Sequence, residues 1–355
     1  MTYLKKIKTT NSLRQQRKEE HLKMALSLKT GPKCAGFEDV EFVHQALSNH
    51  SLDDINTSTC FLGKELKAPF LIEAITGGTL KGKEINKALA KGAFETGIAM
   101  AVGSQTIAIE DPSIRETFSV VREYNPHGVI LANVSANVPV EIALAAIDMI
   151  KADGIQLHLN LAQELLMEEG DRDFRQTGKN IAAIIKDSPV PVIVKEVGFG
   201  FSKETVLELW GLGVKLLDLG GAGGTNFAAI ENSRRSRPLS TDWYQWGIPT
   251  AASILECKAT KLPISIIASG GINNGINAAK ALALGAHMVG AATPFLKSVE
   301  GLSQFNSLND AINTWRLELE MTMLLVGAKN IQDLRKKPLL LTGATKAWQD
   351  SRKLK

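Results

Sequence analysis

Short apolar runs alternate with longer amphipathic stretches along the sequence from position 69 onward. Apolar runs of this length are typical of strands buried on both faces, and helical spacing follows each of them. Strands connected through helices pair in parallel, so eight such units in succession predict a (β/α)8 barrel. The predicted strands cover residues 70–74, 98–102, 128–132, 154–160, 190–194, 214–219, 264–268 and 288–292. An open, doubly wound sheet is the alternative, but no dinucleotide-binding glycine pattern follows the first strand.

Helical spacing is found between the predicted strands and also before the first strand and after the last one. The helices predicted within and after it cover residues 83–96, 112–124, 138–151, 179–187, 203–211, 249–259, 274–284 and, in the tail, 305–325. Ahead of the barrel, residues 11–28 have helical spacing, and residues 31–68 are irregular but carry apolar side chains able to pack on a neighbouring body. We therefore expect an N-terminal extension over residues 1–68 and a barrel with C-terminal helices over residues 69–355.

One predicted strand differs from the others in its polar positions. Gln156, His158 and Asn160 alternate with leucines, so they share one face of the strand. If the sheet is covered on both sides, this face points into a closed interior, where each polar group needs a partner. Gln163 and Glu164 follow where the strand should end and a helix begin. Polar side chains converging at the carboxyl end of a strand favour a site over a core.

Composition excludes several classes of protein. A formal net charge of +4 over 355 residues is too small to indicate nucleic-acid binding. The three cysteines lie far apart, without the spacing of a metal or redox site. No apolar run is long enough to span a bilayer, and the basic N-terminus lacks a hydrophobic signal core. We expect a cytoplasmic protein with neither a nucleic-acid nor a membrane partner.

The loops after the last two strands are suited to phosphate. Ser269-Gly270-Gly271 follows the seventh strand, where backbone amides without side chains can approach an anion at the start of the next helix. Ala291 and Ala292 follow the eighth strand and are small enough to admit the same group. This is where barrels often bind phosphate, and a plain tight turn is the alternative.

Lys195 ends the fifth strand directly after an apolar run, so we expect it at the mouth of the barrel. It is either a rim lysine paired with Glu196 or a cation beside a cofactor ring that carries negative charge, as in flavin sites. Thr76, Ser104 and Asn133 end three other strands at equivalent levels and suit the polar edge of a flat heterocycle.

A glycine-dense segment, residues 220–225, follows the sixth strand. It could serve as the hinge of a lid or could cover a bound ring closely, with Thr225 donating its hydroxyl. Glu231, Arg234 and Arg235 follow in a charged segment that we expect to form salt bridges.

Taken in order, these motifs resemble the FMN-dependent type 2 isopentenyl-diphosphate isomerases. The matching segments are Arg17-Lys18 with His21, Thr76-Gly77-Gly78, Gly103-Ser104-Gln105, Asn133, residues 156–164, Lys195-Glu196-Val197-Gly198, Gly223-Gly224-Thr225-Asn226-Phe227, Trp246-Gly247-Ile248-Pro249-Thr250 and Ser269-Gly270-Gly271. They span nearly the whole chain. Several are common to FMN barrels in general, whereas residues 156–164 and the basic N-terminal motif make the resemblance specific.

The resemblance implies an enzyme that interconverts isopentenyl and dimethylallyl diphosphate by 1,3-allylic proton transfer. It implies reduced FMN and Mg²⁺ as cofactors, and NADPH needed only to reduce the flavin. It also implies a homo-oligomer, a tetramer or an octamer, in which the N-terminal extension helps to close the site.

The resemblance carries site residues over by position. FMN would be held by Ile75, Thr76, Gly77, Ser104, Asn133, Lys195, Gly220, Thr225, Gly271, Ile272, Asn273, Ala291 and Ala292. The substrate would be held by Arg17, Lys18, His21, Ser104, Gln105, His158, Asn160, Gln163 and Ser202, with Glu164 on the magnesium of its diphosphate. Gln163, His158 and Lys195 would be catalytic. Asn273 stands where FMN barrels often have an arginine, so phosphate binding would depend more on backbone amides.

The residues themselves allow several roles for His158, which could be a metal ligand, a general acid or a satisfied interior histidine. We favour hydrogen bonding to diphosphate, because it lies among amides. None of its neighbours on this strand is a strong acid, so the hypothesis is that the proton is exchanged at N5 of the reduced flavin. Lys195 would then stabilise the anionic ring.

Three other functions remain as alternatives. An FMN-dependent 2-hydroxyacid dehydrogenase or oxidase would share the barrel. That function needs an active-site histidine with arginines for a carboxylate late in the barrel, whereas this sequence has Gly-Gly-Ile-Asn at 270–273 and no late His-Gly pair. A reaction like that of IMP dehydrogenase needs a nucleophilic cysteine after the sixth strand, and residues 220–225 contain none. A catalytically silent flavin-binding protein would bind FMN without isomerising a substrate.

Overall fold

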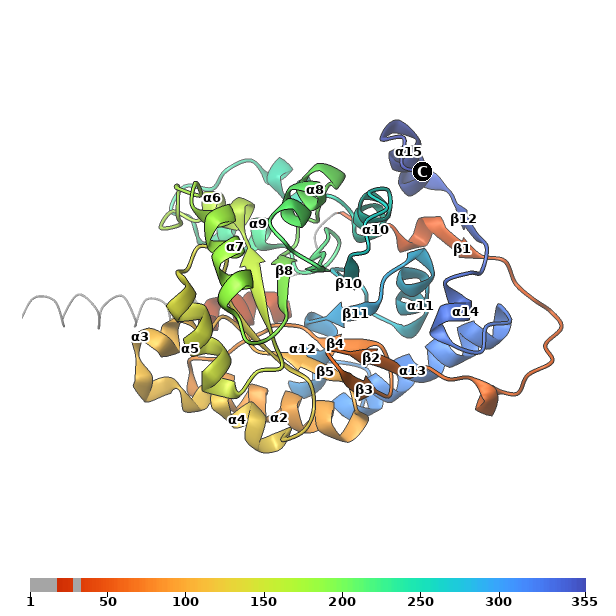
Figure 1. The fold of residues 1–355 in the computed structure, drawn as a ribbon, viewed down its shortest axis with the longest axis horizontal. Helices are drawn as coiled ribbons and strands as arrows, with labels where there is room; N and C mark the ends of the chain where they lie inside the picture. The colour runs from red at the N-terminus through yellow and green to blue at the C-terminus, as the bar shows by residue number, and fades with distance from the viewer. Residues whose placement is uncertain (1–17, 28–32) are drawn as a thin grey trace, which may run out of the picture.

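The computed structural model describes residues 18–27 and 33–355 and confirms the predicted (β/α)8 barrel (Figure 1). Eight parallel strands close into a barrel in which spatial order follows chain order. They are β4 (Phe70–Ile72), β5 (Ala99–Ala101), β6 (Ile130–Ser135), β7 (Gly154–Leu159), β8 (Val192–Glu196), β9 (Leu216–Asp218), β10 (Ser265–Ser269) and β11 (Met288–Ala291). Each lies within or overlaps a predicted strand.

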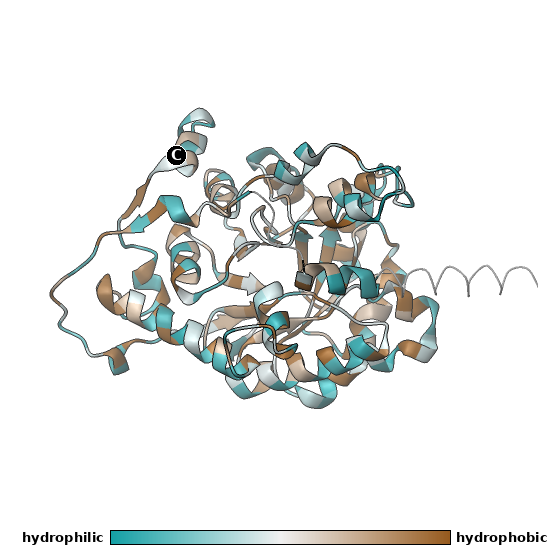
Figure 2. Ribbon diagram, turned by 180° about the vertical axis from the view of Figure 1, so that it is seen from behind, coloured by the Kyte–Doolittle hydropathy of each residue, from teal (hydrophilic) through white to brown (hydrophobic). Residues whose placement is uncertain are grey.

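Helices surround the barrel, as predicted. Those matching the predictions are α2 (Leu80–Thr96), α4 (Glu116–Tyr124), α5 (Val140–Ile150), α7 (Thr177–Asp187), α8 (Lys203–Gly211), α10 (Thr250–Lys258), α11 (Gly275–Leu284) and α13 (Leu308–Leu325). Shorter helices are α3 (Thr106–Glu110), α6 (Leu161–Leu166), α12 (Thr293–Val299), α14 (Ile331–Leu334) and α15 (Gly343–Ser351). Hydrophobic and hydrophilic segments alternate along the surrounding helices, as expected for amphipathic helices (Figure 2).

Two differences from the prediction have a visible local cause. The segment after β9, for which no helix was predicted, contains α9 (Phe227–Arg234), which begins where the Asn226 side chain accepts a hydrogen bond from Ala229 N. The helix expected from residue 112 is preceded by a separate 3₁₀ turn (Pro112–Ile114), which the Asp111 side chain caps by accepting from Ser113 N. In both cases local capping decides where the helix begins.

The segment expected to be irregular contains three short strands. β1 (Val40–Phe42) pairs antiparallel with β12 (Leu339–Leu341), which joins the beginning of the chain to its end. β2 (Thr59–Phe61) and β3 (Lys64–Leu66) form a hairpin. Further towards the N-terminus, residues 18–27 are helical, and Leu22 and Leu26 pack on the main apolar cluster. The rest of the predicted helix lies outside the described residues.

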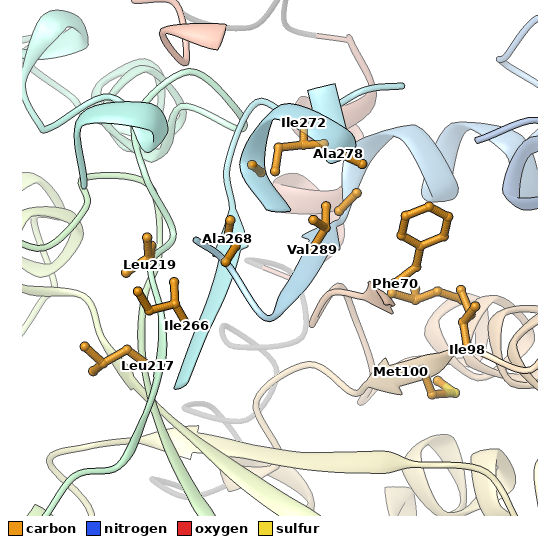
Figure 3. Packing of buried hydrophobic residues seen from close by; sticks show 14 of the residues in the cluster. Phe70, Ile98, Met100, Leu217, Leu219, Ile266, Ala268, Ile272, Ala278 and Val289 are labelled. Carbon is orange, nitrogen blue, oxygen red and sulfur yellow. The ribbon is translucent and has the colours of Figure 1, made fainter. Parts of the chain in front are cut away.

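The barrel strands alternate their side chains between two apolar clusters. The outer cluster lies between strands and helices, and Figure 3 shows part of it, with Leu217, Ile266 and Val289 on the strands and Ala278 on α11. The inner cluster is formed by the strand residues whose side chains point into the barrel, and the β2–β3 hairpin contributes Phe61 to it. Its other buried members are Leu66, Leu71, Ala99, Ala101, Val129, Leu131, Ile193, Ile267 and Met288.

On five of these strands, a polar residue follows two positions after the inward-pointing apolar residue. Since strand side chains alternate with a period of two, these residues point inward like the apolar ones before them. They are Glu73 after Leu71, Asn133 after Leu131, Lys195 after Ile193, Asp218 after Leu216 and Ser269 after Ile267. All five are buried. The carboxyl end of the barrel interior is therefore polar, whereas the other end is apolar.

Among residues 18–27 and 33–355, none of the helices combines the length and apolar composition that crossing a bilayer requires.

Candidate functional site

A cavity of about 710 Å³ opens at the carboxyl ends of the barrel strands. Loops and strand ends from around the barrel line it, and Lys18 and His21 of the N-terminal helix line it as well. The predicted site residues that line it are Lys18, His21, Ile75, Ser104, Asn133, His158, Asn160, Gln163, Glu164, Lys195, Gly220, Thr225, Gly271, Ile272, Asn273, Ala291 and Ala292. Residues far apart in the sequence thus meet in one cavity.

Four predicted residues do not line this cavity in the structure. The Gln105 side chain is fully buried, donating to Ala146 O at 2.9 Å and accepting from Asn133 N at 3.0 Å. Ser202 caps α8 by accepting from Thr205 N. The other two are Thr76 and Gly77. For these four the geometry gives structural roles, and Arg17 lies outside the described residues.

The backbone carbonyls of Thr76 and Gly77 accept hydrogen bonds from residues that line the cavity. The Thr76 carbonyl accepts from Gly103 N at 3.0 Å, and the Gly77 carbonyl accepts from Lys18 Nζ at 3.0 Å. A Cβ on Gly77 would lie 2.1 Å from the Phe118 ring, so only glycine fits. This turn holds Lys18, whose ammonium also donates to Ser104 O at 2.9 Å.

Lys195 lies between two buried carboxyl groups at the base of the cavity. Its Nζ is 2.8 Å from Asp218 Oδ2 and 3.1 Å from Glu73 Oε2. Burial alone would lower the pKa of Lys195, but Asp218 and Glu73 outweigh burial and raise it. Lys195 is therefore a permanent cation. The alternative of a rim pair with Glu196 is wrong, because the Glu196 carboxylate instead accepts backbone N–H groups of the following turn.

The polar face of β7 joins this cluster through a chain of hydrogen bonds. Gln156 Nε2 donates to Asp218 Oδ2 at 3.0 Å, and its Oε1 accepts from Asn133 Nδ2 at 3.0 Å. Asn133 Oδ1 lies 2.9 Å from His158 Nδ1. The prediction of a closed interior is confirmed for Gln156, whereas His158 and Asn160 line the open cavity, and all three side chains have hydrogen-bond partners.

His158 is a neutral imidazole at neutral pH. Burial, followed by the charges of Lys195 and Lys18, lowers its pKa to about 4. Because the Asn133 oxygen accepts from Nδ1, Nδ1 carries the proton and Nε2 is an acceptor. In this state His158 can accept a hydrogen bond or a proton but is not a strong acid.

A second charged cluster connects the N-terminal helix to the rim of the cavity. Glu231 Oε1 accepts from Gln163 Nε2 at 2.8 Å and lies 2.9 Å from His21 Nε2, and Arg234 pairs with both Glu231 and Glu20. Burial alone would raise the pKa of Glu231, but hydrogen bonds and the charge of His21 outweigh it and lower the pKa. The prediction of salt bridges is confirmed for Glu231 and Arg234, whereas Arg235 donates to the backbone carbonyls of Leu166 and Arg237.

Glu164 is held at the rim by two hydrogen bonds. Its Oε1 accepts from Asn160 Nδ2 and its Oε2 from Asp171 N, each at 2.8 Å. In the described part of the chain, no group of three or more His, Cys, Asp or Glu side chains could hold a metal ion. A metal at Glu164 would therefore need ligands from a bound molecule or from water.

Sequence reasoning missed Glu73 and Asp218 as site residues. Each is the only acidic residue in an apolar run that was predicted to be a buried strand, residues 70–74 and 214–219. A carboxylate in such a run needs a buried partner, and that signal could have identified both.

The cavity residues fit a flavin mononucleotide. The volume suits a ligand of that size. Gly270 and Gly271 have φ of 100° and 72°, and a Cβ on Gly224 would lie 2.7 Å from Gly271 N, so glycine keeps this amide accessible to an anion. Lys195 supplies a fixed cation for a ring that carries negative charge.

Comparisons with known proteins place the chain among flavin enzymes. The sequence profile of the family described as "FMN-dependent dehydrogenase" matches residues 162–341. The chain is 47% identical to the isopentenyl-diphosphate delta-isomerase of Moorella thermoacetica over 339 residues, which are 96% of this chain and 97% of the relative. It is 41% identical to that of Listeria innocua over 350 residues, with 98% and 97% covered.

Solved structures with the same fold are more distant in sequence. A lactate oxidase of Pediococcus acidilactici has a TM-score of 0.69 at 16% identity, with 94% of each chain covered. A flavocytochrome b2 has a TM-score of 0.67 at 19% identity, with 92% of this chain and 84% of that chain covered. At these identities the likeness supports the barrel fold alone.

Proposed function

This chain belongs to the FMN-dependent dehydrogenase family and, within it, to the FMN-dependent isopentenyl-diphosphate delta-isomerases, and we propose how its cavity performs that reaction. The reaction interconverts isopentenyl and dimethylallyl diphosphate by 1,3-allylic proton transfer. The observation that carries this conclusion is the identity of 47% over nearly the full length of a curated isomerase.

We propose that the cavity residues identified above hold FMN in its reduced form, with NADPH as its reductant. When bound, reduced FMN would supply an electron-rich ring suited to proton exchange with an alkene. Lys195 would balance negative charge on this ring, and Asn133 and Ser104 would contact its polar edge. The backbone at Gly270 and Gly271, with small side chains at Ala291 and Ala292, would admit the phosphate. Asn273 is exposed, so this phosphate site would rely mainly on backbone amides.

The substrate diphosphate would lie toward the N-terminal helix. Lys18 and His21 supply cationic or hydrogen-bonding groups there, and His158 and Asn160 line the adjoining wall. Gln163 Nε2 donates to Glu231, and the amide oxygen of Gln163 would face the reacting carbons. The contacts of residues 18–27 with the barrel would help to keep water from this part of the cavity.

Mg²⁺ would be bound jointly by Glu164 and the substrate diphosphate. A hard divalent cation prefers carboxylate and phosphate oxygens, and Mg²⁺ often uses one protein carboxylate with substrate phosphates. Glu164 lines the cavity, which supports this arrangement. We also propose a cytoplasmic homo-oligomer, a tetramer or an octamer, on the basis of the family resemblance.

An FMN-dependent 2-hydroxyacid oxidase is the second candidate, because structures such as lactate oxidase share the barrel. The experiment that separates the two reduces the purified protein anaerobically with NADPH and Mg²⁺ and adds isopentenyl diphosphate in D₂O. Deuterium incorporation into both isomers, followed by NMR, is the expected result. Binding of FMN without deuterium incorporation would overturn the isomerase, and reduction of the flavin by lactate or glycolate would establish the second candidate.

A further inference from the structure

Glu73 is a buried carboxyl group of the cavity to which the isomerase reaction assigns no role. It follows β4 and is 3% exposed. Its Oε2 lies 3.1 Å from Lys195 Nζ and 3.3 Å from Gln156 Nε2. Its Oε1 is buried and has no hydrogen-bond partner among residues 18–27 and 33–355. One oxygen of this group is therefore satisfied and the other is not.

The charges around Lys195 are unequal in number. One ammonium faces two carboxyl groups, those of Asp218 and Glu73. Asp218 has partners on both oxygens, because Oδ2 accepts from Lys195 and Gln156 and Oδ1 from the Ser269 hydroxyl. Asp218 is therefore the natural anionic partner of Lys195. A second ionised carboxylate would leave one uncompensated negative charge in the barrel interior, which is costly.

The space around Glu73 Oε1 is also specific. A Cβ on Gly290 would lie 2.1 Å from this oxygen, so glycine on β11 is what leaves room for the carboxyl group. Burial and the charge of Asp218 raise the pKa of Glu73 to about 8, with Lys195 acting in the opposite direction. The titratable groups that face this cluster are Lys195 from β8, Asp218 from β9 and, further along the cavity, His158 from β7. Both the charge count and the pKa favour a neutral carboxylic acid.

We propose that Glu73 holds a proton at neutral pH and that it acts through Lys195 as a positioning residue, setting the charge beside the cofactor site. With the proton in place, the cluster of Glu73, Lys195 and Asp218 is neutral overall and can accept negative charge on a bound ring. Without it, the cluster carries one negative charge that opposes such a ring. The effect on the cofactor rests on the proposed function, whereas the protonation state does not.

The protonation state is tested without cofactor chemistry. Infrared difference spectra between pH 6 and pH 10 are compared for wild type, Glu73→Gln and Glu320→Gln, the last removing a glutamate of α13 outside the barrel. Besides the signal of Glu196, whose pKa is about 7, we expect a carbonyl band of a protonated carboxylic acid that disappears near pH 8 in wild type and Glu320→Gln and is missing in Glu73→Gln. Absence of this band in wild type, or its survival in Glu73→Gln, would overturn the proposal.

Should Glu73→Gln fail to fold, the wild type labelled with ¹³C at the glutamate carboxyl carbon gives the same information. Burial also raises the pKa of Glu196, to about 7, so Glu196→Gln tells the two carboxyl groups apart. A carboxyl signal that titrates near pH 8 and persists in Glu196→Gln supports the proposal. If every glutamate carboxyl group of Glu196→Gln is already ionised at pH 6, the proposal is contradicted.

The role toward the cofactor is tested through the midpoint potential of bound FMN as a function of pH. Adding negative charge to the ring raises the proton affinity of Glu73, so reduction takes up extra protons near and above pH 8. The wild type should therefore show a steeper pH dependence in that window than on either side, and Glu73→Gln a constant slope. An unchanged profile in Glu73→Gln would overturn this role. If the protein binds no FMN, the proposed function fails, while the infrared result still decides the protonation state.

Discussion

The two ends of the barrel interior are built from the same strands but differ in chemistry. On β6 the inward residue is Leu131 at one end and Asn133 two positions later, and on β8 it is Ile193 and then Lys195. The first layer is apolar and is covered by the β2–β3 hairpin. The second is a network of amides, carboxyl groups and an ammonium. A single two-residue step therefore separates a conventional core from a candidate active site.

This difference indicates how the fold divides stability from function. The apolar layer gains stability from removing surface from water. The polar layer must satisfy each group with another member of the layer, and its unsatisfied groups are the ones that can receive a ligand. Among the described residues, Glu73 Oε1 is such a group. Substitutions in the two layers should therefore have different consequences.

The largest effect is expected from removing the cation of the polar layer. Lys195→Met leaves Asp218 without its ammonium partner, and breaking a buried ion pair typically costs about 3–5 kcal/mol of stability. The same change should weaken FMN binding by about 100-fold, or about 2.7 kcal/mol. Thermal unfolding and equilibrium dialysis with FMN measure the two effects.

The control for this variant is Lys186→Met on the exposed side of α7. It removes a lysine without touching the barrel interior, so both quantities should stay at their wild-type values. A Lys195→Met protein that retains FMN and full activity would show that the cation is not what distinguishes the polar layer.

A smaller effect, confined to stability, is expected in the apolar layer. Leu131 is fully buried, so Leu131→Ala leaves a cavity and should reduce the free energy of unfolding by about 2–4 kcal/mol. The affinity for FMN should change by less than about twofold, because the polar layer is retained. The exposed Leu207 on α8 provides the matched control, and Leu207→Ala should cost less than about 0.5 kcal/mol. A large loss of FMN affinity in Leu131→Ala would mean that the two layers are coupled.

The sequence could predict the barrel because each strand is a recognisable apolar run. It could predict one polar strand, because β7 has six residues and its alternation is visible. It did not pair Glu73 and Asp218 with Lys195, because β4 and β9 are three residues long, and one acidic residue in an apolar run signals a buried partner without showing which residue that partner is. The pairing of β1 with β12 joins residues about 300 positions apart and has no local signal.

Motif positions also proved insufficient to fix side-chain direction. Gln105 lies in a segment that matches the isomerase motifs, beside Ser104, which does line the cavity. Its own side chain instead joins α5 to β6 through Ala146 and Asn133. Which neighbour points into the cavity is decided by packing that only the three-dimensional structure contains.

The smallest effect on the protein itself is expected at the rim of the polar end, at Glu164. Its carboxylate accepts two hydrogen bonds, and Glu164→Gln keeps the shape of the side chain while removing the negative charge, so stability should change by less than about 1 kcal/mol. If Glu164 binds the magnesium of the substrate diphosphate, the Mg²⁺ concentration for half-maximal isomerisation should rise about tenfold, equivalent to about 1.4 kcal/mol. Glu168→Gln, on an exposed residue nearby, should leave that concentration unchanged. An unaltered Mg²⁺ requirement in Glu164→Gln would remove this residue from metal binding and would restrict the functional part of the polar end to the layer around Lys195.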